Sequence, residues 1–179
     1  RVPILDYWSE DNMRTVICTV GTSLIRNTRR DTGEVQINRW QIINRLNSVS
    51  AEEASAETNS ITRLRKKEVI QEGDRLVFLN SATEEGELCS DVLAEYYKKG
   101  NFETRTQEIE DLKYDEKLFA THGLKQLVDV LVELIQKYRD DGELSICATG
   151  GFKAEIAYAT LVGIVFQVPV YYLHEKFHD

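Results

Sequence analysis

The most informative part of the chain is residues 145–154, Ser-Ile-Cys-Ala-Thr-Gly-Gly-Phe-Lys-Ala. It predicts a short apolar strand that ends at Thr149, followed by two glycines and a helix with Lys153 in its first turn. Glycine lets the backbone approach a ligand closely and adopt angles that a side chain forbids. The N–H groups of a helix start, together with one ammonium group, suit a phosphate. This stretch therefore predicts a strand-to-helix turn that binds an anion.

The rest of the chain repeats the alternation of strand and helix. Apolar and β-branched runs predict strands at residues 15–20, 75–80, 102–109, 144–149 and 168–173. Helical patterns lie at residues 38–47, 51–67, 85–99, 124–138 and 152–166. This order predicts an α/β fold, with a Rossmann-like, doubly wound and mainly parallel sheet between flanking helices.

Two of the predicted helices differ in character. Residues 51–67 are polar and charged, so we expect them to pack at the edge with a solvated face. Residues 152–166 carry only two charges, Lys153 and Glu155, both in the first turn. A helix that lacks a polar face must be covered on more than its sheet side. We expect a symmetric homodimer to supply that cover, and the alternative is the 51–67 helix of the same subunit.

Composition limits the classes of function. A chain of 179 residues is expected to form one domain. Its net charge of −8 argues against a protein that coats DNA or RNA, including double-stranded nucleic acid, but allows a small anionic ligand in one pocket. Cys18, Cys89 and Cys147 lack a metal-type spacing and are expected to be buried free thiols in a reducing compartment. The sequence has no membrane-length apolar run and no signal peptide, which indicates a cytoplasmic domain.

Three of the predicted strands end in loops of small or polar residues. In an open α/β sheet, ligands bind beyond the carboxyl ends of the strands, near the switch in strand order. We therefore expect the loops to meet at one edge and to offer hydroxyls, backbone N–H groups and one lysine to phosphate and ribose oxygens. The candidate binding residues are Gly21, Thr22, Ser23, Ser81, Ala82, Thr83, Glu84, Thr149, Gly150, Gly151, Phe152 and Lys153.

Each loop taken alone also has a simpler structural interpretation. Ser23 or Ser81 would serve as a helix N-cap, and the glycine pair would form a tight turn. Lys153 is harder to explain in this way, because a lysine at a helix start opposes the helix dipole. The basic run of residues 26–30 is assigned to a long loop after the first strand, from which it would reach a phosphate.

Several familiar motifs are absent or misleading. The sequence contains no P-loop, and its first loop lacks Gly-x-Gly-x-x-Gly, so we expect no dinucleotide cofactor. Residues 174–178, His-Glu-Lys-Phe-His, match the His-Glu-x-x-His zinc pattern. That chemistry needs both imidazoles on one helix face and a further ligand. Because the pair directly follows a predicted strand, we interpret it as a solvated tail and expect no metal.

The loops together resemble those of CARF (CRISPR-associated Rossmann-like) domains, which sense cyclic oligoadenylate second messengers in type III CRISPR systems. The similarity covers residues 15–177 and is greatest to small CRISPR-associated proteins near the ring nucleases. It rests on residues 19–23, 80–84, 148–154 and 168–175. The Thr-Gly-Gly-Phe-Lys motif at residues 149–153 is the most specific of these segments.

The resemblance implies a homodimer with the ligand lying across its two-fold axis. Cyclic tetra-adenylate is the expected ligand, and the hexa-adenylate is the alternative. Lys153 would pair with a phosphate, and Gly150 and Gly151 would donate backbone N–H groups. Thr22, Ser23 and Thr83 would bind ribose or phosphate oxygens.

The resemblance leaves the function open between two classes. The favoured one is a binding sensor that drives an attached effector. The alternative is a ring nuclease, in which a ribose 2′-hydroxyl attacks the neighbouring phosphate without a metal. Ser23 and Lys153 match catalytic positions of such nucleases, but the loops lack a histidine to act as general base. A nucleotide-dependent metabolic enzyme built on the same sheet is a third, more distant possibility.

The domain division follows from the same resemblance. Residues 1–14 are expected to form an N-terminal extension, the remnant of a linker to a missing segment, and residues 15–179 the CARF domain. An attached effector is expected upstream of Arg1, since the CARF fold takes up the rest of the chain. A membrane helix there would be one such effector and the only route to a membrane.

Overall fold

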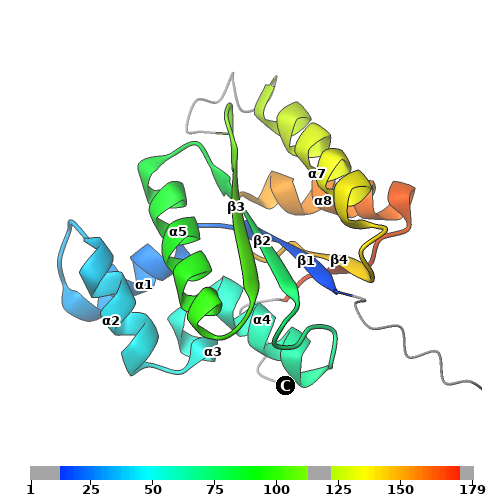
Figure 1. Cartoon of the computed structure of the whole chain (residues 1–179). Coiled ribbons are helices and arrows are strands. Elements are labelled where there is room, and N and C mark those ends of the chain that lie inside the picture. Colours follow the sequence, from blue (N-terminus) through cyan, green and yellow to red (C-terminus); the bar gives the residue numbers. More distant parts are fainter. Residues whose placement is uncertain (1–12, 113–121, 174–179) are drawn as a thin grey trace, which may run out of the picture.

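A parallel β-sheet forms the centre of the protein (Figure 1). The computed structural model describes residues 13–112 and 122–173, and within them the sheet has five strands in the order β3-β2-β1-β4-β5. The strands are β1 (Thr15–Val20), β2 (Arg75–Ser81), β3 (Glu103–Ile109), β4 (Leu144–Cys147) and β5 (Val170–Tyr171). Every neighbouring pair is parallel. This confirms the predicted Rossmann-like α/β fold and places the switch in strand order between β1 and β4.

Helices cover both faces of the sheet (Figure 1). They are α1 (Ser23–Thr32), α2 (Arg39–Ser48), α3 (Ala51–Ala54), α4 (Ala56–Lys66), α5 (Glu84–Lys99), α7 (Leu124–Tyr138) and α8 (Lys153–Phe166). The first five cover one face, where the core includes Val16 and Cys18 of β1. Helices α7 and α8 cover the other face, where Ile17 points. Because successive strand residues point to opposite faces and both faces are covered, β1 is buried along its whole length.

The three cysteines are buried and free, as predicted. Cys18 and Cys147 lie side by side in the register of β1 and β4. Contact with Cys147 and burial raise the pKa of the Cys18 thiol well above its ordinary value. Burial likewise raises the pKa of Cys89 to about 12. The Cys18 and Cys89 thiols therefore stay protonated and act as small apolar core residues.

The basic residues 26–30 lie in a helix, so their assignment to a loop is wrong. They belong to α1, which buries only Ser23, Leu24, Ile25 and Thr28 and exposes its other side. The helix ends at Gly33, whose φ of 73° is left-handed and suits a residue without a side chain. This buried stripe is too short to produce a clear helical period in the sequence.

The segment 51–67 differs from its prediction in two ways. It is broken at Ser55, whose hydroxyl accepts a hydrogen bond from Thr58 N (3.1 Å) while Thr58 Oγ1 accepts one from Ser55 N (3.0 Å). This reciprocal capping ends α3 and starts α4. Helix α4 is also not a solvated edge helix, because Glu57, Thr58, Asn59, Ser60, Ile61 and Leu64 are buried. Polar side chains can be buried here because they hydrogen-bond to one another and to nearby loops.

Helix α8 exposes an apolar face. Tyr158, Leu161, Ile164 and Val165 have exposed fractions of 37%, 58%, 69% and 73%. Helix α4 packs on the opposite face of the sheet, so the alternative in which residues 51–67 cover this helix is wrong. Among the described residues, no helix has the length and apolarity needed to cross a membrane.

Candidate functional site

Two of the three predicted loops touch at the switch in strand order. A Cβ atom on Gly21, after β1, would lie 2.6 Å from the backbone nitrogen of Gly151, after β4. A Cβ atom on Gly150 would lie 2.6 Å from Thr19 O and 2.8 Å from Gly21 N. The Thr19 hydroxyl donates a 2.6 Å hydrogen bond to Gly150 O. Only glycines allow this backbone contact, which gives a physical reason for both glycine positions.

The third loop lies at the same sheet edge, because β2 pairs with β1 in parallel. Its polar groups bond within the loop, to α5 and to the segment that follows β3. Thr83 is the N-cap of α5 and accepts a hydrogen bond from Gly86 N (3.1 Å), and its hydroxyl lies 3.0 Å from that of Ser81. Ala82 N donates to Leu112 O (3.1 Å). Glu84 is exposed at the first position of α5.

The remaining predicted site residues are divided between the two touching loops and the starts of their helices. Thr22 and Phe152 are the N-cap residues of α1 and α8, and Lys153 is exposed at the first position of α8. Gly151 has a φ of 92°, a conformation that favours glycine. Thr149 accepts a hydrogen bond from Leu173 N (3.2 Å), which links the loop to the segment after β5.

A buried carboxylate that sequence analysis missed lies against the touching loops. Glu57, in the first turn of α4, is only 2% exposed. Its Oε1 accepts a hydrogen bond from Gly21 N (2.9 Å), and its Oε2 accepts one from the Ser23 hydroxyl (2.8 Å). Ser23 Oγ also accepts from Ala56 N (3.0 Å), so the hydroxyl is fully engaged by α4. The simpler interpretation of Ser23 as a helix N-cap is therefore wrong, and Thr22 is the N-cap residue of α1.

A second buried carboxylate lies against Gly151 of the glycine pair. Glu155 of α8 is 2% exposed, and its Oε1 accepts a hydrogen bond from Phe152 N (2.8 Å). Its carboxyl group fills the space in which a Cβ atom on Gly151 would lie. Burial, and to a smaller extent the nearby charge of Glu57, raise the pKa of Glu155 to about 7. The loops expected to hold phosphates thus contact two buried acidic groups.

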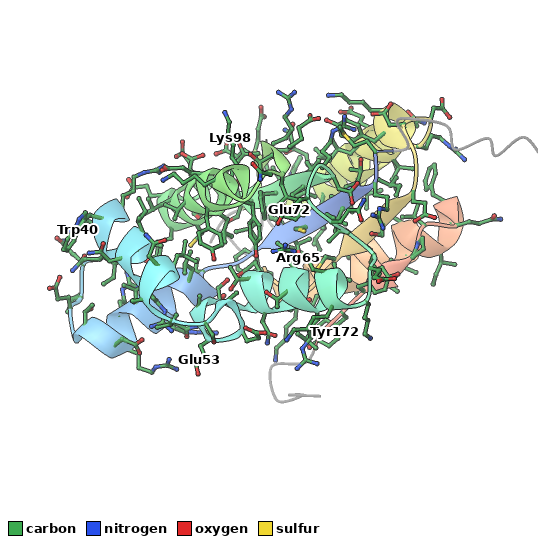
Figure 2. The ribbon with its side chains drawn as sticks, turned by 60° about the horizontal axis from the view of Figure 1, so that its bottom comes forward. Trp40, Glu53, Arg65, Glu72, Lys98 and Tyr172 are labelled. Carbon is green, nitrogen blue, oxygen red and sulfur yellow. The ribbon has the colours of Figure 1, made fainter. Side chains whose placement is uncertain are left out.

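A polar pocket of about 210 Å³ opens beside this contact. It lies between α1, the α3–α4 junction, and the residues that follow β4 and β5. Its lining residues are Ser23, Arg26, Asn27, Arg30, Glu52, Glu53, Ser55, Ala56, Asn59, Thr149 and Leu173. Of the predicted binding residues, only Ser23 and Thr149 line it. Figure 2 shows Glu53 and Tyr172 on the same side of the molecule as α4.

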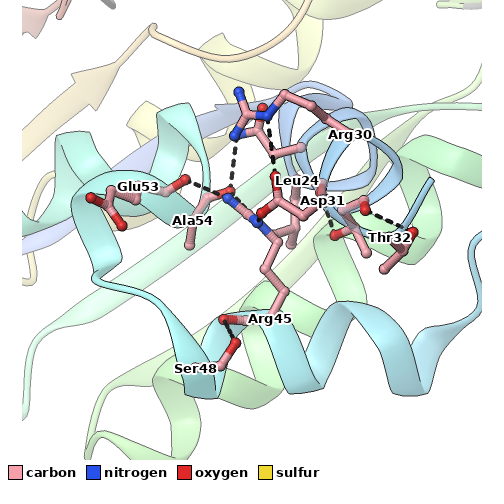
Figure 3. A network of polar contacts seen from close by, with 10 residues as sticks. Leu24, Arg30, Asp31, Thr32, Arg45, Ser48, Glu53 and Ala54 are labelled. Carbon is pink, nitrogen blue, oxygen red and sulfur yellow. Dashed lines mark hydrogen bonds and ion pairs between the residues drawn. The ribbon is translucent and has the colours of Figure 1, made fainter.

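The α3–α4 junction is held in place by a network around Arg45 (Figure 3). The buried Arg45 guanidinium donates to Glu53 O (2.9 Å) and Ala54 O (3.4 Å) and forms an ion pair with Asp31. Asn27 of α1 also donates to Ala54 O (3.1 Å). These bonds satisfy carbonyls at the end of α3 and fix the start of α4. The backbone that carries Glu57 is therefore anchored.

The sequence contained a weak signal for Glu57. It is the acidic residue of a first helical turn, and its neighbours Ala54, Ser55, Ala56 and Ser60 are small. Small residues let a helix approach a loop closely. No sequence period, however, indicates which loop that helix meets, because the loop after β1 lies more than thirty residues away in the chain.

Metal-binding geometry is absent from the part of the chain that the structure describes, where no group of three His, Cys, Asp or Glu side chains is arranged around an ion. The sequence pattern His174–His178 lies outside the described residues.

Comparison with protein-family models places the chain among known proteins. A family described as CRISPR-associated protein (Cas_APE2256) matches residues 52–179, which is most of the chain. The matched region includes α4 with Glu57, the loops after β2 and β4, and α8 with Glu155. The chain belongs to this family of CRISPR-associated proteins.

Proposed function

We propose that this CRISPR-associated protein binds a cyclic oligoadenylate, first of all cyclic tetra-adenylate, across a homodimer. It would act as the sensor domain of a type III CRISPR accessory effector. The observation that carries the proposal is the contact between the loops after β1 and β4 at the switch in strand order. This is the place where open α/β sheets bind nucleotides.

The polar pocket beside the loops supports a nucleotide ligand. Hydroxyl and amide groups of Ser23, Asn27, Asn59 and Thr149 surround it, as ribose and base edges require. Arg26 and Arg30 add guanidinium groups on one side. Arginine is well suited to phosphate because of its planar fork of donors. In a chain with a net charge of −8, such local cations would have to supply the attraction for a polyanion.

The apolar face of α8 supports the homodimer. Leu161, Ile164 and Val165 are more than half exposed, which is costly in water for a contiguous patch. Lys153 begins the same helix. A two-fold axis running along α8 would cover this face and place both copies of the loop at the same end of the dimer. A cyclic ligand with its own rotational symmetry would fit such an axis.

The engagement of Ser23 favours a sensor over a ring nuclease. Its hydroxyl is bonded to Glu57 and Ala56 and is 8% exposed. A hydroxyl held in this way must first be released before it can contact a ligand, whereas cleavage needs groups that are already positioned on the reacting ribose and phosphate. Binding needs fewer aligned groups than catalysis does.

The proposal is tested by incubating the purified chain with radiolabelled cyclic tetra-adenylate and separating bound, free and cleaved ligand. Retention of the intact ring is the expected result. Release of linear di-adenylate with cyclic phosphate ends would identify a ring nuclease. Binding of AMP or ATP without binding of the tetra- or hexa-adenylate ring would identify a nucleotide-dependent enzyme instead. Linear tetra-adenylate serves as the control for ring recognition.

A further inference from the structure

The anion-binding groups of the loop after β1 are already occupied by a group of the protein itself. Gly21 N–H and the Ser23 hydroxyl both donate to the carboxylate of Glu57, at 2.9 and 2.8 Å. These are the kinds of donors that hold a phosphate at a helix start. A carboxylate and a phosphate present the same type of oxygen acceptor, so the two compete for the same hydrogen bonds.

Among the described residues, the partners of the Glu57 carboxylate are hydrogen-bond donors. Within the described ranges, the ion pairs of the structure do not include it. The starts of two helices, α1 and α4, contribute positive dipole ends near the carboxylate. A buried anion without a cation is costly unless such donors compensate for the lost water. The loop is therefore built to hold an anion, and Glu57 is the anion that it holds.

We propose that Glu57 is an internal competitor of the ligand: its carboxylate occupies Gly21 N–H and the Ser23 hydroxyl until a ligand phosphate replaces it. The inference rests on the proposed function, because it names the group that a cyclic oligoadenylate must displace. Displacement is a movement of the Glu57 side chain, since Arg45 and Asn27 anchor the backbone before α4. A ligand with many phosphates can offset this cost through its other contacts, whereas a mononucleotide has fewer contacts with which to do so.

Two variants separate competition from support of the loop. Glu57→Ala removes the competitor, and Glu57→Gln keeps its shape and an acceptor for Gly21 N–H while removing the charge. Glu53→Gln is the matched control, because Glu53 is an exposed acid that lines the same pocket. Thermal melting of each variant, and of Glu57→Gln in particular, checks that the fold is retained.

The affinity for cyclic tetra-adenylate is measured by calorimetry. We expect Glu57→Ala to bind about tenfold more tightly than wild type or better, the scale of one charge-assisted hydrogen bond. Glu57→Gln should show a smaller gain, and Glu53→Gln should change the affinity less than about threefold because its charge is screened. Unchanged or weaker binding by both Glu57 variants would overturn the proposal. Weaker binding by Glu57→Ala that Glu57→Gln restores would also overturn it and make Glu57 a positioning residue.

A second measurement keeps this inference separate from the identity of the ligand. Inorganic phosphate is titrated into ¹⁵N-labelled protein while the Gly21 amide resonance is followed. We expect the resonance to shift in Glu57→Ala at phosphate concentrations that leave it unchanged in wild type. If this occurs while no form of the protein binds cyclic tetra-adenylate, the competition stands and the proposed ligand is wrong. If the resonance does not shift, the competition is overturned whatever the wild type binds.

Discussion

Lys153 is the one cation that the Thr-Gly-Gly-Phe-Lys motif contributes, and it is exposed at the first position of α8. Its charge opposes the dipole of that helix. We expect Lys153→Ala to weaken cyclic tetra-adenylate binding by about 1.5–3 kcal/mol, the scale of a charged hydrogen bond. Its melting temperature should stay the same or rise. Calorimetry and thermal melting measure the two effects, with Lys153→Arg as the charge-preserving control. Unchanged affinity in Lys153→Ala would refute the phosphate contact.

Glu155 makes stability depend on pH. Its pKa is raised from an ordinary value of 4.5 to about 7 in the folded protein, mainly because it is buried. The folded state therefore binds its proton more tightly than the unfolded state does. Its contribution to stability is fully present below pH 4.5 and is lost as the pH rises through 7, by at most about 3 kcal/mol.

The test compares the free energy of unfolding of Glu155→Gln with that of the wild type between pH 5 and pH 8. This range spans most of the titration of Glu155. Glutamine keeps the acceptor for Phe152 N and does not titrate. The free energy of unfolding of the wild type should fall as the pH rises across this range. That of Glu155→Gln should fall less, and the difference is the contribution of Glu155. Glu87→Gln, at an exposed site on α5, is the control and should behave as wild type. Equal slopes for wild type and Glu155→Gln would contradict the assignment.

Among the elements, the exposed apolar face of α8 gives a direct test of the proposed dimer. Ile164 is 69% exposed and lies in the apolar face of this helix. If that face is a dimer interface, Ile164→Glu places a charge in it and should convert a dimer into a monomer. The stability of the protomer should change little, because the side chain is mostly in solvent there.

Light scattering coupled to gel filtration measures the mass of each form. Gln136→Glu, on an exposed side of α7, is the control and should leave the dimer intact. A wild-type protein that is monomeric at the concentrations tested would remove the dimer from the proposed function. So would an Ile164→Glu variant that remains dimeric.

Elements were predictable where their period was long and apolar. The helix predicted at residues 124–138 (α7) and the strand predicted at residues 15–20 (β1) have the predicted bounds in the structure. Helix α1 was missed and segment 51–67 was read as one solvated helix, because a short buried stripe and a buried polar face leave little hydrophobic period. The break at Ser55 depends on reciprocal hydrogen bonds with Thr58, which a helical pattern does not show.

At the scale of the whole molecule, the contact between the two loops joins the halves of the sheet on either side of the switch point. It links Thr19 to Gly150 across more than a hundred residues of sequence. We expect Gly150→Ala to lower the free energy of unfolding by about 1–3 kcal/mol, because its Cβ atom would meet the backbone at Thr19 O and Gly21 N and the Glu57 carboxylate.

Chemical denaturation measures this loss. Gly100→Ala is the matched control, because the added Cβ atom would lie 3.4 Å from its nearest neighbour, Tyr97 O. This variant should change the free energy of unfolding by less than about 0.5 kcal/mol. If Gly150→Ala were as stable as wild type, the close approach of the loops would be wrong. The position of Glu57 between them would then be wrong as well.

The alternation of strands with most of the helices could be predicted from the sequence alone, and with it the parallel sheet and the edge at which the loops gather. Those properties follow from local hydrophobic periods and from glycine and cap residues, which act over a few neighbouring positions. The charges that lie at that edge could be identified only from the three-dimensional packing. Glu57 reaches Gly21 and Ser23 because α4 folds back onto the start of α1, and the resulting acid beside the glycines comes from long-range packing that no local pattern encodes.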